Sequence, residues 1–135
     1  MAGSKGTSSS ARALRVLIVD DNKDSADALA MNLASDVNIV SVANSGKAAL
    51  AAASTSRPDV VILDIGMVDP NGYEVARILR EQYADQRMLL IAVTGWAGEG
   101  NRQRAMDAGF DHHMVKPVPT AELEELIAKW GEAPE

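Results

Sequence analysis

The sequence has 135 residues, enough for one domain of common size and too few for a second hydrophobic core. Hydrophobic residues make up 47% of the chain and charged residues 24%, the composition of an ordinary globular protein. The formal net charge of −6 argues against a general nucleic-acid binder, which needs clustered Lys and Arg. The chain contains no cysteine, which excludes disulfides, zinc–thiolate sites and thiol nucleophiles.

The two ends of the chain differ in composition from its middle. Residues 1–10 are rich in Gly, Ser and other small residues without an apolar period, which predicts a disordered leader or an expression remnant. We therefore divide the chain into a leader at 1–14, one folded domain at 15–131 and a short tail at 132–135. No apolar run approaches the roughly 20 residues of a membrane span, so we expect a cytoplasmic protein without membrane insertion.

Five segments have the length and composition of β-strands. Continuous apolar runs at 16–19, 60–63 and 88–93 predict strands that are buried on both faces of a sheet. The segments 38–42 and 111–115 mix polar with apolar residues, which predicts strands at the sheet edges.

Helical periodicity follows each of these strands in turn. Apolar residues recur with helical spacing, or cluster after a capping residue, at 26–33, 48–52, 75–79, 103–107 and 123–130. Five strand–helix repeats joined by right-handed crossovers build a parallel sheet with helices on both faces. The sequence thus predicts an α/β fold, a flavodoxin-like doubly wound (βα)5 domain with the strand order 2-1-3-4-5.

Polar residues stand where four of the predicted strands end. Asp20 and Asp21 follow the first strand, Asp64 the third, Thr94 the fourth and Lys116 the fifth. Each one alone is an ordinary turn former or helix cap. Because the carboxyl ends of parallel strands form one rim, where open α/β sheets bind ligands, we expect all five to converge there.

This combination of charges predicts a particular chemistry. Three adjacent carboxylates repel one another unless a cation neutralises them, and all-oxygen ligands favour Mg²⁺, with Mn²⁺ as a substitute. Lys116 and Thr94 supply a positive charge and a hydroxyl donor suited to the oxygens of a phosphoryl group. A carboxylate is also a competent nucleophile toward phosphorus, and Asp64 is the central candidate.

These residues resemble the receiver (response-regulator) family of two-component signalling, over nearly the whole predicted domain. The resemblance rests on Asp20-Asp21, on Asp64 followed by Gly72-Tyr73-Glu74, on Thr94-Gly95 and on Lys116-Pro117. The segment Ala108-Gly109-Phe110-Asp111-His112-His113 is most similar to the receivers of hybrid histidine kinases.

The resemblance implies a phosphorelay function in which Asp64 accepts a phosphoryl group from a phosphohistidine. It implies that Asp21, Asp64 and the Gly66 backbone carbonyl bind Mg²⁺ directly, while Asp20 holds the ion largely through water. Thr94 and Lys116 then bind phosphoryl oxygens, and the Lys116-Pro117 peptide is cis. The implied partner is a histidine kinase or a histidine phosphotransfer protein, and the domain is a monomer or a phosphorylation-dependent dimer.

Two positions depart from the family pattern. His113 stands where a Tyr or Phe usually turns inward as the hydroxyl residue, here Thr94, moves, so we expect His113 and Thr94 to form the switch. Val68 and Asp69-Pro70-Asn71 replace the usual residues of the loop after Asp64, which predicts an altered loop and not lost phosphorylation.

The sequence also leaves alternatives to weigh. A turnover phosphatase with an aspartate nucleophile needs a second acid where Gly66 stands, and a flavin-binding module needs a phosphate loop where Asp20-Asp21-Asn22 stands. We therefore expect no enzyme in the ordinary sense, but a signalling domain that catalyses only its own phosphorylation and dephosphorylation. The remaining alternative is a receiver-like module that binds proteins without being phosphorylated.

Overall fold

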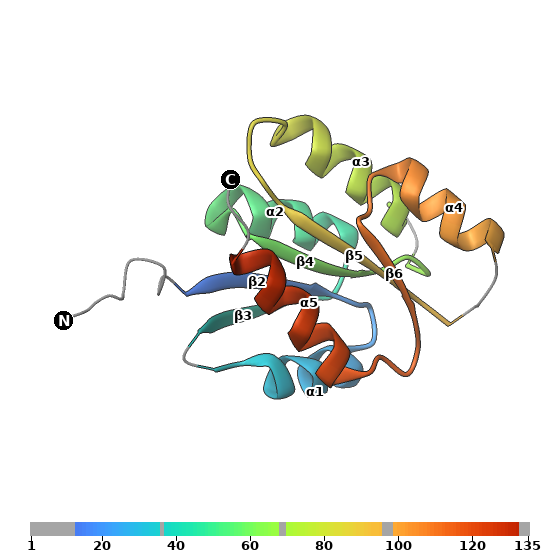
Figure 1. Cartoon of the computed structure of the whole chain (residues 1–135). Helices are drawn as coiled ribbons and strands as arrows, with labels where there is room; N and C mark the ends of the chain where they lie inside the picture. The colour runs from blue at the N-terminus through green and yellow to red at the C-terminus, as the bar shows by residue number, and fades with distance from the viewer. Residues whose placement is uncertain (1–12, 36, 68–69, 96–98, 133–135) are drawn as a thin grey trace.

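The computed structural model describes residues 13–35, 37–67, 70–95 and 99–132. Within these residues, strands and helices alternate along the chain (Figure 1). The strands are β2 (Leu14–Val19), β3 (Asn38–Ala43), β4 (Val60–Asp64), β5 (Leu89–Thr94) and β6 (His112–Val115). The helices are α1 (Lys23–Leu33), α2 (Gly46–Ser56), α3 (Gly72–Gln82), α4 (Glu99–Ala108) and α5 (Thr120–Glu132).

All the strands belong to one sheet with the spatial order β3-β2-β4-β5-β6. Each neighbouring pair is parallel, and the pairing of Val19 with Leu63 sets the ends of β2 and β4 level. Counted along the chain, this is the predicted order 2-1-3-4-5, so the flavodoxin-like fold is confirmed. The two segments that mix polar and apolar residues, β3 and β6, form the edges as expected.

Helices cover both faces of the sheet. Helices α1 and α5 lie on one face, and α2, α3 and α4 lie on the other (Figure 1). The apolar side chains of the central strands alternate between these two layers, so that Ile18 and Ile62 enter one core and Leu17 and Leu63 the other. Burial on both faces explains why the three central strands are continuous apolar runs in the sequence.

Three helices begin at residues that cap their first turn. Asn22, Ser45 and Asn71 each accept a hydrogen bond from a backbone N–H of the helix that follows, and Asn71 forms a full capping box with Glu74. Capping satisfies N–H groups that have no partner within the helix. The caps thereby start α1, α2 and α3 soon after the strand ends and keep the intervening loops at one rim of the sheet.

Arg80 on α3 joins this helix to the β6 side of the sheet. Its guanidinium donates to the backbone oxygens of Gly109 and Met88, both at 2.8 Å, and to Asp111 Oδ2 at 2.9 Å. Asp111 Oδ2 also accepts from the N–H of Leu90, the second residue of β5. These bonds fix the start of β6 relative to α3 and β5, and so help to position Lys116, which follows the other end of the strand.

The element boundaries differ slightly from those that we predicted. Strand β2 begins at Leu14, one residue inside the predicted leader, and α5 continues to Glu132, one residue beyond the predicted domain. Leu14 is half-buried and packs against the core under α1 and α5, which explains why the strand includes it. The predicted departure at Val68 and Asp69 lies outside the described residues. In the described part of the chain, no helix is long and apolar enough to cross a bilayer.

Candidate functional site

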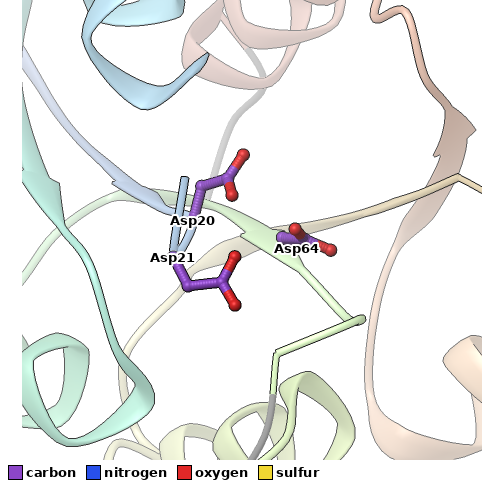
Figure 2. A group of neighbouring side chains, drawn as sticks. All are labelled: Asp20, Asp21 and Asp64. Atoms are coloured by element: carbon purple, nitrogen blue, oxygen red, sulfur yellow. The ribbon is translucent and has the colours of Figure 1, made fainter. Parts of the chain in front are cut away.

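Three carboxylates gather at the ends of β2 and β4 (Figure 2). Asp20 and Asp21 directly follow β2, and Asp64 is the last residue of the neighbouring β4. Each of the three offers one carboxylate oxygen, and these oxygens all lie within 4.8 Å of one another. Asp20 is buried, Asp64 is half-buried and Asp21 is exposed, so the group opens to solvent on one side.

Lys116 joins two of these carboxylates. Its Nζ lies 3.1 Å from Asp64 Oδ2 and 3.4 Å from Asp20 Oδ2. The residue follows β6, and its backbone N–H donates to the oxygen of Thr94 at 2.8 Å, which sets it beside the end of β5. The Lys116-Pro117 peptide bond is cis, as the resemblance implied.

The remaining carboxylate oxygens are held by the backbone. Asp20 Oδ1 accepts from the N–H of Asn22 at 2.9 Å, and Asp64 Oδ1 accepts from the N–H of Gly66 at 2.8 Å. Each carboxylate therefore uses Oδ1 for its own loop and turns Oδ2 toward Lys116. The orientation of both groups is fixed by the chain before any ligand binds.

The charges of the site perturb one another. Burial raises the pKa of Asp20, and the nearby negative charge of Asp64 adds to that effect, although the Asn22 N–H and Lys116 oppose it. Burial by itself lowers the pKa of Lys116, but the hydrogen bonds and charges of Asp64 and Asp20 more than offset this and leave the pKa raised. The Asp20 shift thus comes mainly from burial, whereas the Lys116 shift comes from the two carboxylates beside it.

A pocket of about 630 Å³ opens beside these groups. Its lining includes the charged side chains of Asp20, Asp64 and Lys116. Apolar residues also line it, among them Leu29 of α1 and Val118 of the segment that follows Lys116. A charged group therefore has access to Asp64 from solvent.

Two further predicted residues lie on β5 and β6. Thr94 ends β5 and is only 4% exposed, at the same rim as the carboxylates. His113 lies on β6 with its Nε2 atom buried and without a hydrogen-bond partner among the described residues. Burial lowers the pKa of His113, and the positive charge of Arg102 on α4 lowers it further.

Sequence reasoning overlooked one residue of this region. Asn44, directly after β3, donates from its side-chain amide to the backbone oxygen of Asp20 at 2.9 Å. The signal was present, because a polar side chain at the carboxyl end of a parallel strand is the feature that identified the others. Taken alone, however, this signal is weak, because Asn is also a common turn former.

Comparison with known proteins places these features in one family. The family model described as the response regulator receiver domain matches residues 16–128. The chain is 34% identical to hybrid signal transduction histidine kinase L of Dictyostelium discoideum, over 87% of this chain and 7% of the kinase. It is also 34% identical to response regulator MprA of Mycolicibacterium vanbaalenii, over 86% of this chain and 48% of that protein. The chain thus spans less than half the length of either relative.

The fold is also similar to that of solved structures. One is a CheY-like response regulator receiver domain protein from Methanospirillum hungatei, with a TM-score of 0.80 and 28% identity. The match covers 89% of this chain and 94% of that one, so the likeness extends over the whole fold.

Proposed function

Since this chain belongs to the response regulator receiver domain family, we propose that it is the phosphoacceptor of a phosphorelay and that Asp64 carries the phosphoryl group. The donor is a phosphohistidine of a histidine kinase or of a histidine phosphotransfer protein. The observation that carries the proposal is the surroundings of Asp64, whose carboxylate lies 3.1 Å from Lys116 and within reach of two further carboxylates.

The donor set fits a hard divalent cation. Asp20, Asp21 and Asp64 provide only oxygen ligands, and the exposure of Asp21 leaves room for water, which Mg²⁺ retains in most protein sites. We propose that Asp21, Asp64 and the Gly66 carbonyl hold Mg²⁺ directly, that Asp20 acts largely through water, and that Mn²⁺ substitutes. When bound, the metal neutralises negative charge at the transferring phosphoryl group.

The chain's own side chains perform the rest of the transfer. A carboxylate oxygen of Asp64 attacks phosphorus, a P–O bond forms, and the P–N bond to the donor imidazole breaks, which leaves an acyl phosphate on Asp64. Lys116 forms an ion pair with Asp64 before the transfer, and after it the same ammonium group binds a negatively charged phosphoryl oxygen. The hydroxyl of Thr94 donates to another oxygen of the same group.

We propose that the same event switches a protein-binding face. Thr94 ends β5 and is buried, so its movement toward the phosphoryl group changes the packing around it. His113 lies on β6, the strand that pairs with β5, and no hydrogen bond from its Nε2 to a described residue opposes a change in the position of its ring. The output face is then formed by α4, β6 and α5.

The proposal extends to the setting of the domain. We expect one phosphoryl group per chain with no continuous turnover of a substrate, because the nucleophile is itself the modified group. We propose that the domain works in the cytoplasm and extends from the start of β2 at Leu14 to the end of α5 at Glu132, one residue beyond the predicted bounds at each end. It works as a monomer or a phosphorylation-dependent dimer.

Intact-mass spectrometry tests the central claim. The protein is incubated with acetyl phosphate and Mg²⁺, and the wild type is compared with Asp64→Asn and with Asp85→Asn, an exposed acid of the α3–β5 loop. We expect one phosphoryl group on the wild type and on Asp85→Asn, none on Asp64→Asn, and none after chelation of Mg²⁺. Labelling that persists in Asp64→Asn contradicts the assignment, and no labelling of the wild type favours a module that binds proteins without phosphorylation.

A further inference from the structure

Both backbone polar groups of Asp20 are hydrogen-bonded to residues at the end of β3. Its N–H donates to the oxygen of Ala43 at 3.1 Å, and its own oxygen accepts from Asn44 Nδ2 at 2.9 Å. The paired residues of β2 and β3 end at Val19 and Ala43. Beyond that point, the amide side chain of Asn44 takes the place of the next strand N–H.

The hydrogen bond from Asn44 holds a peptide group that affects the positions of both Asp20 and Asp21. The oxygen of Asp20 belongs to the peptide that joins Asp20 to Asp21. The orientation of this peptide sets the direction in which the two Cα–Cβ bonds leave the chain. Asn44 therefore acts on the direction of both carboxylates through a bond to the backbone between them.

The two residues that follow Asn44 are held by contacts of their own. The next residue, Ser45, caps α2 by accepting from the N–H of Ala48 at 3.0 Å. Gly46 follows and lies so close to Pro70 that a Cβ at this position would be 2.8 Å from both its Cγ and its backbone oxygen. Pro70 belongs to the loop that begins after Asp64. The turn at residues 44–46 thus contacts the Asp20 side of the site and the loop of Asp64.

From these contacts we infer that Asn44 is a positioning residue for the divalent-cation site. The inference rests on the proposed function, because it assumes that the carboxylates bind Mg²⁺. Residues that orient metal ligands without touching the metal typically change metal affinity by about 10- to 100-fold when they are replaced. Asn44 holds a shared peptide and not a ligand atom, so we expect the lower end, about a 10-fold weaker affinity for Mg²⁺ in Asn44→Ala.

The same strand offers a matched control. Asn38, the first residue of β3, donates from its side-chain amide to the backbone oxygen of Leu33 at 3.2 Å. Asn38→Ala removes the same kind of hydrogen bond at the opposite end of β3, far from the carboxylates. A purely structural role predicts similar effects of the two substitutions, whereas a positioning role predicts that only Asn44→Ala alters the metal site.

Calorimetric titration with Mg²⁺ and urea unfolding in chelator distinguish these cases. We expect both variants to lose similar stability without metal, and only Asn44→Ala to raise the Kd for Mg²⁺ about 10-fold. Its labelling by acetyl phosphate should be slow at limiting Mg²⁺ and recover at saturating Mg²⁺. The inference is overturned if Asn44→Ala binds Mg²⁺ as the wild type does, if Asn38→Ala weakens binding equally, or if the slow labelling persists at saturation. A wild type that binds no Mg²⁺ refutes the proposed function instead.

Discussion

Replacing Asp20 by Asn should stabilise the metal-free protein. Asp20 is buried, and its carboxylate stands with those of Asp21 and Asp64 in a group whose oxygens lie within 4.8 Å of one another. Asn retains an oxygen for the N–H of Asn22, so the substitution removes the charge and preserves the shape and this hydrogen bond, while its amide nitrogen takes the place of the Oδ2 that accepts from Lys116.

The size of the effect follows from the separations of the charges. Two like charges 4.8 Å apart repel by about 3.5 kcal/mol at an effective dielectric constant of about 20. The attraction between Asp20 and Lys116 at 3.4 Å is about 5 kcal/mol on the same scale. Removing two repulsions and one attraction leaves a net gain of about 2 kcal/mol, before solvent screening at the open side reduces it.

The raised pKa of Asp20 also indicates that its negative charge destabilises the folded state. A carboxyl group whose pKa is higher in the folded state than in the unfolded state lowers the free energy of unfolding at pH values above that pKa. Neutralising it by substitution should therefore raise stability at pH 7.5 and have less effect as the pH falls through its raised pKa.

Urea unfolding at pH 7.5 with and without Mg²⁺ measures the effect. Without metal, Asp20→Asn should be more stable than the wild type by about 1 to 2 kcal/mol. Mg²⁺ at 100 times its Kd should stabilise the wild type by about 2.7 kcal/mol and the variant by less at the same concentration. Glu124→Gln, an exposed acid on α5, controls for the net charge and should change stability by less than about 0.5 kcal/mol. A metal-free variant that is less stable than the wild type would refute the repulsion argument.

Two further predictions concern a switch position and a close packing contact. The lowered pKa of His113 means that the unfolded state binds a proton first as the pH falls below about 6.5, so the stability that its neutral ring contributes is lost on acidification. His113→Phe should then show a smaller loss of unfolding free energy between pH 7.5 and 5.5 in urea titrations, and an equal loss shows that other groups dominate. Gly72→Ala should destabilise the protein by about 3 kcal/mol, because the new Cβ would lie 2.5 Å from Ile65 Cα. Gly100→Ala, which meets nothing within 4 Å, should be neutral or stabilising by up to about 1 kcal/mol, and equal thermal shifts of the two variants would contradict the packing argument.

Much of the fold follows from short-range patterns in the sequence. The apolar runs at 16–19, 60–63 and 88–93 correspond to β2, β4 and β5, because strands buried on both faces tolerate no polar interruption. The edge positions of β3 and β6 followed from their mixed composition. Boundaries were less accurate, since the cap and packing contacts that end an element involve residues outside the periodic pattern.

The polar residues of the site were also accessible from the sequence. Asp20, Asp21, Asp64, Thr94 and Lys116 stand at strand ends, and in a parallel sheet all the carboxyl ends meet at one rim. That rule requires only the strand positions and the handedness of the crossovers.

How these groups are held depends on contacts that no local pattern specifies. The strand ends place Lys116 at one rim with Asp20, Asp21 and Asp64, but they do not show that its Nζ contacts Oδ2 of both Asp20 and Asp64. The strand-end position of Asn44 is visible in the sequence, but its bond to the Asp20 carbonyl and the close approach of Gly46 to Pro70 are not. Periodicity records which face of an element is buried, whereas these contacts join residues far apart in the chain and depend on rotamers and loop paths that the packing of the whole domain selects.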